Sequence, residues 1–280
     1  MTLLHILTVA VVQGITEFLP ISSQAHLVLI PHLTGWCDQG PVIDIGVHFG
    51  TLLAVIVYFR RDCLSLARGA GAAVRGKRTG ETRLALQILI ATAPVLAAGY
   101  ILQKGLGISF RDPGVIAWMT LGFGILLWVG DRWGPKDKGL DRMTGSAAFA
   151  IGCAQVLALI PGTSRSGVTM TAARMLGFDR AEAARFSLLM AIPVILAAAT
   201  LAGIDVVQTG DVSLTWAVAV AVAFAFVAAL IAIAAMMRWL RHASFTPFVA
   251  YRCLLGIALL TAVYGFGFGQ SQSLATCVGG

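Results

Sequence analysis

The sequence predicts an all-α integral membrane protein, and two observations support this. Of the 280 residues, 58% are apolar and 12% are charged, whereas soluble domains average roughly 45–50% and 25%. Several apolar stretches also reach the ~20 residues that a helix needs to cross a bilayer. The composition excludes disordered and nucleic-acid-binding proteins, which need many more polar residues. The five cysteines are scattered and odd in number, so neither a disulfide framework nor a zinc site is indicated.

Six stretches are long and apolar enough to be transmembrane helices: residues 42–59, 84–102, 113–130, 187–203, 214–237 and 248–266. Two other apolar regions are interrupted by polar segments that contain proline and glycine, at residues 13–26 and 161–167. Lipid cannot satisfy the backbone of such segments, so they must be buried against protein or line a wet cavity. We therefore predict two re-entrant helical hairpins, at residues 3–34 and 146–177.

The orientation of the chain follows from its lysines and arginines. Segment 60–83 carries seven of them against only Asp62 and Glu81, which predicts that this segment lies in the cytoplasm. Threading the six spans from this segment puts 16 of the 20 basic residues inside and both termini outside. The net charge of +7 is then mostly an orientation signal and an attraction to anionic lipid headgroups.

The two polar segments also resemble each other. With Pro20 aligned on Pro161, an offset of 141 residues, residues 18–23 match residues 159–164 in type. Chance similarity between two turns is the alternative, but length, order and topology all agree with a repeat. An odd number of crossings puts the two halves in opposite orientations, with a site where they meet. We therefore predict a single membrane domain, 1–280, built from inverted repeats 1–140 and 141–280.

Few ionisable residues lie within the predicted hairpins, and such residues in a membrane indicate function by default. The first hairpin contains Glu17 and His26, and the second contains Arg165. If both turns reach the same depth, these side chains converge with small and hydroxyl residues: Ser22, Ser23, Gly162, Thr163, Ser164 and Ser166. An arginine fork and backbone amides freed by glycine suit an anion, and a phosphate fits best.

Phosphate chemistry needs a nucleophile, a proton handler and a positive charge. Ser23 and His26 are both candidate nucleophiles, and the residues alone do not rank them. Glu17 is a candidate general acid or base, or a ligand of a divalent metal. Gln13 lies one helical turn before Glu17, so both side chains share a helix face.

Each of these residues also has a structural alternative. Hydroxyls in membrane turns usually satisfy backbone groups, and we favour this interpretation for three residues taken singly: Ser22, Thr163 and Ser166. His26 alone is as often a helix contact as a functional group. Glu17 and Arg165 fit a structural role least well, because a buried charge is costly. A purely structural ion pair between them remains the alternative.

Three polar residues outside the turns have weaker signals. We interpret His48 as a packing residue or an indirect hydrogen-bond partner. Asp44 is interpreted as the interfacial end of its span, and Arg252 as a residue that snorkels or pairs within the bundle.

At these segments the chain resembles the undecaprenyl-diphosphate phosphatase family, the bacitracin-resistance type of integral membrane phosphatase. The resemblance rests on residues 13–27, 48–55 and 161–167. It implies hydrolysis of undecaprenyl diphosphate to undecaprenyl phosphate and inorganic phosphate, which recycles the lipid carrier for peptidoglycan synthesis and confers bacitracin resistance. It also implies a divalent cation, Mg²⁺ or Ca²⁺, and a multi-pass protein of the bacterial cytoplasmic (inner) membrane whose site faces the periplasm.

The resemblance also implies roles for single residues. The family's acidic pair falls on Gln13 and Glu17, its motif serine on Ser23, its histidine on His26 and its phosphate-binding arginine on Arg165. Gln13 stands where many members have glutamate, which weakens a two-carboxylate metal site and leaves Glu17 as its one carboxylate. Residues 24–25 are Gln-Ala instead of the commoner Ser/Thr-Gly, so a hydroxyl ligand is lost there. We expect an active enzyme with altered metal dependence.

A transporter or flippase for a polyprenyl phosphate is the competing class. Inverted repeats with broken helices at mid-membrane are typical of transporters, and both classes would use the same phosphate site. The expected partners are the lipid substrate and membrane lipids, with no nucleic acid, and a homodimer is left open.

Overall fold

The computed structural model describes residues 1–105, 112–134, 137–209 and 215–266. Over these residues the chain forms helices and no β-strand, apart from an isolated bridge between Lys138 and Phe178. The prediction of an all-α protein is confirmed.

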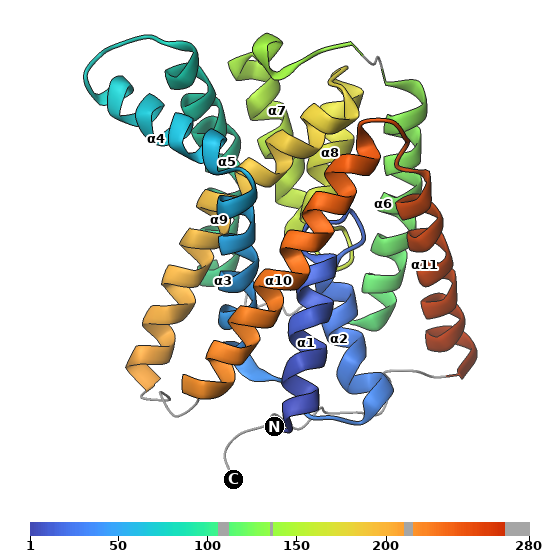
Figure 1. Cartoon of the computed structure of the whole chain (residues 1–280). Helices are drawn as coiled ribbons and strands as arrows, with labels where there is room; N and C mark the ends of the chain where they lie inside the picture. Colours follow the sequence, from blue (N-terminus) through green and yellow to red (C-terminus); the bar gives the residue numbers. More distant parts are fainter. Residues whose placement is uncertain (106–111, 135–136, 210–214, 267–280) are drawn as a thin grey trace.

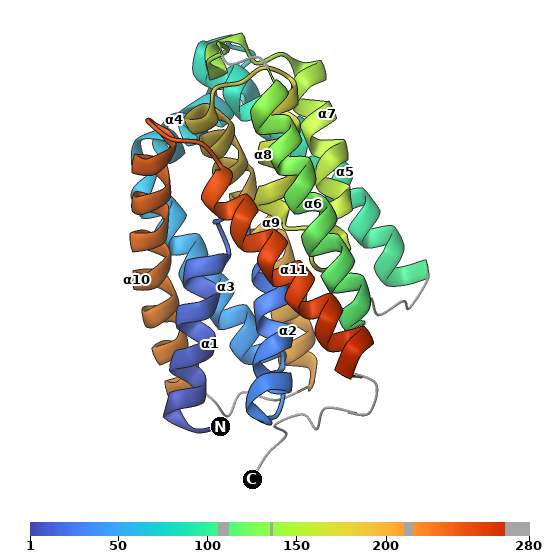
Figure 2. The same ribbon diagram turned by 90° about the vertical axis from the view of Figure 1, so that its right-hand side faces the viewer.

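Six helices of the described chain are long and apolar enough to cross a membrane, which confirms the six predicted spans. They are α3 (Gly40–Tyr58), α5 (Gly80–Gly105), α6 (Pro113–Trp133), α9 (Arg180–Thr209), α10 (Thr215–Leu240) and α11 (Thr246–Phe266). Proline at the first or second position of α3 and α6 is compatible with these helix starts, because the amide that proline lacks has no partner there. Figure 2 shows α6 and α11 packed side by side.

Two pairs of shorter helices form hairpins, one before the first span and one between α6 and α9. The first pair is α1 (Leu3–Thr16) and α2 (Ser23–Thr34), and the second is α7 (Gly145–Val156), followed by the 3₁₀ turn η2 (Leu157–Leu159), and α8 (Arg165–Met175). In Figure 1 the two hairpins approach from opposite ends of the bundle, and their turns meet near its middle. Their re-entrant position in a bilayer and the inverted repeat remain predictions.

The two turns share an uncommon backbone conformation. Ser22 and Ser164 have φ angles of 72° and 70°, and they are the non-glycine residues with positive φ in the described chain. Each lies directly before the second helix of its hairpin. The two serines are 142 residues apart, which is one residue more than the offset of 141 that aligns Pro20 with Pro161. Gly162 has a φ of 91°, and a Cβ there would lie 2.4 Å from the carbonyl oxygen of Ile116, so only glycine fits.

Each hairpin is held by a neighbouring long helix. Helix α1 packs against α10, and α7 packs against α5. Phe18, in the first turn, is fully buried in the largest apolar cluster together with Leu127 and Met170. The first turn is therefore anchored in the centre of the protein, where side chains from both halves meet.

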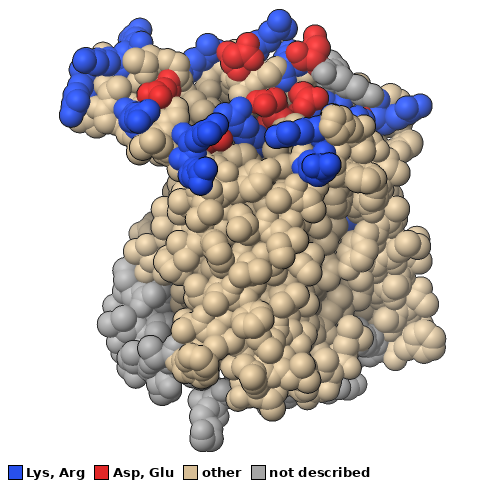
Figure 3. All heavy atoms as spheres, viewed as in Figure 1, with Lys and Arg blue, Asp and Glu red and all other residues tan. Residues whose placement is uncertain are grey.

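The charged side chains gather at one end of the molecule. Figure 3 shows lysine and arginine concentrated at the end that carries α4 and the start of α7. Segment 60–83 is not a plain connection, because its first part forms the helix α4 (Arg60–Val74). At the same end, Asp131 accepts hydrogen bonds from Arg174, Arg180 and the backbone amide of Phe245. This network joins the ends of α6 and α8 to the starts of α9 and α11.

Cys37, in the connection between α2 and α3, is disulfide-bonded, which the scattered cysteines did not indicate. Three other cysteines are free: Cys63, Cys153 and Cys253.

Candidate active site

Glu17 is the centre of the polar cluster at the first turn. It follows the last residue of α1, and the amide Nε2 of Gln13, one helical turn earlier, donates to its Oε2 at 2.9 Å. The hydroxyl of Ser23, the first residue of α2, donates to the same oxygen at 2.6 Å. The predicted shared face of Gln13 and Glu17 is thus present, and a serine hydroxyl is directly bonded to the carboxylate.

Arg165 brings the second hairpin to this cluster. It is the first residue of α8, and its Nη2 lies 3.2 Å from Glu17 Oε1, with side-chain exposures of 14% and 7% for the arginine and the glutamate. Its Cζ also lies 5.8 Å from the centre of the Phe18 ring. The second terminal nitrogen, Nη1, is buried and has no hydrogen-bond partner among the described residues. The predicted ion pair is present, but it uses only part of the guanidinium.

Two side chains, Ser166 and Arg252, join the two turns to each other besides this ion pair. Ser166 donates from its hydroxyl to the carbonyl of Leu19 at 3.0 Å. The guanidinium of Arg252, from α11, is buried and donates to the carbonyl of Pro20 in the first turn and to the carbonyls of Gly162 and Thr163 in the second. It also donates to two carbonyls of α6: Met119 and Thr120. Arg252 therefore neither snorkels nor depends on a carboxylate, because backbone oxygens of both turns and α6 surround it.

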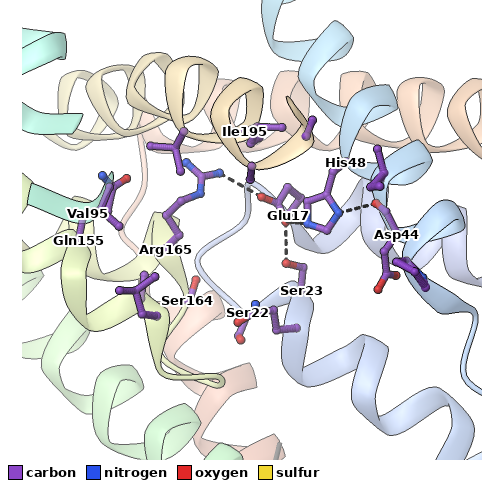
Figure 4. Close-up of a pocket in the computed structure, with 18 residues that line it drawn as sticks. Glu17, Ser22, Ser23, Asp44, His48, Val95, Gln155, Ser164, Arg165 and Ile195 are labelled. Atoms are coloured by element: carbon purple, nitrogen blue, oxygen red, sulfur yellow. Dashed lines mark hydrogen bonds and ion pairs between the residues drawn. The ribbon is translucent and has the colours of Figure 1, made fainter. Parts of the chain in front are cut away.

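A cavity of about 420 Å³ opens beside Glu17 and Arg165. Its polar lining comes from α2, α3, α7, α8 and the two turns: Glu17, Ser22, Ser23, Gln24, Asp44, His48, Gln155, Ser164 and Arg165. Its apolar lining comes mainly from α9, with Val194 and Ile195 as examples, and includes Val95 of α5 and residues of α3 and η2. Figure 4 shows Gln155 and Val95 on one side of Arg165, and Glu17, Ser23 and His48 on the other. The cavity therefore combines a charged floor with a wall suited to a hydrocarbon chain.

Several predicted site residues lie outside this lining. His26 stacks on the Tyr251 ring and bonds through Nε2 to the Tyr251 hydroxyl at 2.5 Å, while its Nδ1 bonds to the carbonyl of Ser22. Thr163 is fully buried behind the second turn. Gly162 and Ser166 hold the turns together and do not line the cavity. Of the two candidate nucleophiles, only Ser23 lies in the cavity and contacts Glu17.

Two residues that the sequence signals only weakly do line the cavity. His48 Nε2 lies 3.9 Å from Glu17 Oε2, and its Nδ1 bonds to the carbonyl of Asp44, one helical turn earlier. Gln155, which the sequence does not single out, is fully buried. The sequence signal for His48 is its place on one helix face with Asp44, four residues earlier. No sequence signal indicates Gln155, because its spacing from Ser164 gains meaning only from the positive φ of that serine.

The fold and the cavity define a class of protein: a multi-pass helical membrane protein with a buried carboxylate, arginine and serine in one pocket. A family model described as "Bacitracin resistance protein BacA" matches residues 6–258. The chain belongs to this family.

Curated relatives match over nearly their whole length. The undecaprenyl-diphosphatase of Roseobacter denitrificans is 50% identical over 266 residues, which cover 94% of this chain and 100% of that protein. The undecaprenyl-diphosphatase of Dinoroseobacter shibae is 49% identical with the same coverage. Undecaprenyl-diphosphatase 1 of Rhodospirillum rubrum is 48% identical over 272 residues, covering 94% of this chain and 96% of that protein.

Proposed function

We propose that this protein hydrolyses undecaprenyl diphosphate to undecaprenyl phosphate and inorganic phosphate, which recycles the lipid carrier for peptidoglycan synthesis and confers bacitracin resistance. Family membership and the names of the relatives support this activity. The observation that carries it is the 2.6 Å hydrogen bond from Ser23 to Glu17, in a pocket that also holds Arg165. A hydroxyl bonded to a carboxylate is a nucleophile next to its base, and the arginine suits the phosphate that it would attack.

The first step uses Ser23, Glu17 and Arg165. The Ser23 oxygen attacks the terminal phosphorus, and its proton passes to Glu17 Oε2. The bond between that phosphorus and the bridging oxygen breaks, and undecaprenyl phosphate leaves. The free Nη1 of Arg165 binds phosphate oxygens and offsets the negative charge that develops on the leaving group. Gln13 holds Oε2 in place through its amide nitrogen.

The second step regenerates the enzyme. Water attacks the phosphoserine, the bond between phosphorus and the Ser23 oxygen breaks, and the proton on Glu17 returns to that oxygen. Both protons of the water stay on phosphate oxygens, so the product forms as H2PO4−. Inorganic phosphate leaves, and one water has been consumed for each anhydride bond broken. Arg165 places its positive charge beside the Glu17 carboxylate throughout the cycle.

A divalent cation fits the oxygen atoms of this site. Gln13 Oε1 is buried without a hydrogen-bond partner among the described residues, and Glu17 contributes a carboxylate beside it. Such oxygen ligands suit Mg²⁺ or Ca²⁺. The described residues contain no group of three or more His, Cys, Asp or Glu side chains able to hold a metal, so phosphate oxygens of the substrate would supply further ligands. A bound cation would neutralise phosphate charge.

We also propose that the protein lies in the bacterial inner membrane with its pocket open to the periplasm. The gathering of lysine and arginine at the α4 end supports a cytoplasmic location for that end. Pro41 and Asp44, near the start of α3, line the pocket toward the opposite end. The bonded Cys37 lies just before α3 and suits an oxidising compartment. With Arg78→Cys in a variant whose free cysteines Cys63, Cys153 and Cys253 are replaced by serine, a membrane-impermeant maleimide should label the protein only after cells are lysed. Labelling of intact spheroplasts would contradict this orientation.

Phosphate release from undecaprenyl diphosphate by the purified protein in detergent tests the activity. We expect turnover with Mg²⁺ or Ca²⁺, and a trapped phosphoenzyme that is stable in acid and labile in alkali, as a phosphoserine is. Ser23→Ala should abolish both signals, whereas His26→Gln should reduce turnover less and keep the same lability. An acid-labile phosphoenzyme would contradict the assignment of Ser23. Lipid binding without turnover, with any divalent cation, would instead favour a transporter or flippase.

A further inference from the structure

Gln155 occupies the same place in the second hairpin as Gln13 does in the first. Each glutamine lies nine residues before the serine with positive φ, which is Ser22 in one turn and Ser164 in the other. Both glutamine side chains are 0% exposed. The two amides are therefore a matched pair, which equivalent helices carry toward the centre of the bundle.

The surroundings of the two amides differ. Gln13 donates to Glu17, four residues later. The corresponding position after Gln155 is Leu159, which has no polar side chain. Neither the nitrogen nor the oxygen of the Gln155 amide has a hydrogen-bond partner among the described residues. An amide buried without partners is costly, and a bound ligand that supplies them is a common reason for such a group to persist.

The free amide lies in the same cavity as another free donor. Gln155 lines the pocket, and so does Arg165, whose Nη1 is also buried without a partner in the described chain. In Figure 4 Gln155 lies next to Val95 and faces the space beside Arg165. Because no partner fixes the amide, its donor end can turn toward an anion bound there.

We propose that Gln155 is a substrate-binding residue whose side-chain nitrogen donates to a phosphate oxygen of the lipid diphosphate, beside Arg165 Nη1. This inference rests on the proposed function and extends it, because it adds a neutral donor on the side of Arg165 where Figure 4 also shows Val95. At that place a neutral amide orients the diphosphate without adding a second charge that would hold the product. Hydrogen bonds to charged groups are stronger than those between neutral groups, so its loss should weaken binding about tenfold.

The experiment compares Gln155→Leu with Gln87→Leu as a matched control. Gln87 is also a buried glutamine of the bundle, but its amide nitrogen donates to the carbonyl of Met143 and it does not line the cavity. Each purified variant is titrated with inorganic diphosphate at a fixed divalent cation concentration, and ligand protection is read from the melting temperature. The KM and kcat for undecaprenyl diphosphate are measured on the same samples.

The melting temperatures of the two variants without ligand should change in opposite directions. Gln155→Leu should melt at a higher temperature than wild type without ligand, because a buried amide without partners is replaced by an apolar group of similar size. It should bind diphosphate about tenfold more weakly and raise KM more than it changes kcat. Gln87→Leu should melt at a lower temperature and bind diphosphate as wild type does. Gln155→Glu should bind more weakly still, since its carboxylate repels the phosphates.

A structural role for Gln155 would give a different result. If Gln155→Leu lowers the melting temperature and leaves diphosphate binding and KM unchanged, the inference is wrong, whereas wild-type turnover would still support the proposed hydrolysis. If wild type binds diphosphate through Gln155 but releases no phosphate from the lipid, the proposed hydrolysis fails and the binding site stands. The binding and turnover measurements therefore separate the two failures.

Discussion

The α1–α2 and α7–α8 hairpins share one turn geometry and carry different chemistry. In each, a serine with positive φ is followed by the first residue of the next helix, which is Ser23 in one hairpin and Arg165 in the other. The first hairpin supplies a carboxylate and a hydroxyl, and the second supplies a guanidinium and a free amide. The comparison shows that one backbone turn can place two functions at the centre of a bundle, depending on the residue that follows it.

Neither hairpin forms the pocket alone. The ion pair between Glu17 and Arg165 joins their side chains, and Arg252 joins their backbones. In the mechanism that we propose, proton transfer belongs to the first hairpin and charge neutralisation to the second. Three predictions test this division, in order of decreasing effect.

Removing the cation of the second hairpin should have the largest effect. Arg165→Ala should lower kcat/KM for undecaprenyl diphosphate about 10³-fold, because both the phosphate and the developing charge lose their partner. Arg165→Lys keeps a charge but loses the planar fork, so it should fall between Arg165→Ala and wild type. Steady-state phosphate release measures this, with thermal unfolding as the control for folding. If both variants fail to fold, Arg165 is structural and the division between the hairpins is wrong.

Removing the link between the two turns should mainly affect stability. Arg252→Met leaves the carbonyls of Pro20, Gly162 and Thr163 without their donor, so we expect the free energy of unfolding to fall by about 3 kcal/mol. Arg238→Met, at an exposed position of α10, should change it by less than about 0.5 kcal/mol. Denaturation in mixed detergent measures both variants. Equal stabilities would show that the turns hold their positions without Arg252.

The smallest expected effect is a difference in stability between alanine variants of the two equivalent serines, Ser22 and Ser164. Ser164 accepts a hydrogen bond from the amide of Gly167 and caps α8, whereas Ser22 makes no such bond at the start of α2. Ser164→Ala should therefore lower the free energy of unfolding by about 1 kcal/mol more than Ser22→Ala does. Both variants keep the same strained φ, so the difference between their free energies of unfolding measures the contribution of the N-cap hydrogen bond. Equal losses would mean that the cap contributes nothing here.

The sequence predicted the spans well and the helix α4 poorly, for a physical reason. A membrane helix needs an apolar run of fixed length, and all six runs are readable in the sequence. Helix α4 lies among the charged residues at one end, where no such requirement acts on its composition. Its charges therefore predicted its side of the membrane but not its conformation.

The part of the site that contains buried charges was predictable from the sequence. Glu17 and Arg165 are costly in a membrane, so their pairing could be anticipated, and Ser23 followed from its place in the same turn. The partner of His26 could not be anticipated, since Tyr251 is 225 residues away in the chain. Gln155 is uncharged, and its spacing from Ser164 has meaning only once the positive φ of that serine is known.

The position of Arg252 in the chain also bears on how the protein is made. Glu17 and Ser23 are synthesised well before Arg252, the residue that joins the two turns, because Arg252 belongs to the last described helix. Domains are completed in chain order during synthesis. A partly synthesised chain therefore contains Ser23 without the contact that holds the first turn against the second. The hydrogen bonds from Arg252 to both turns can therefore form only after α11 has been synthesised.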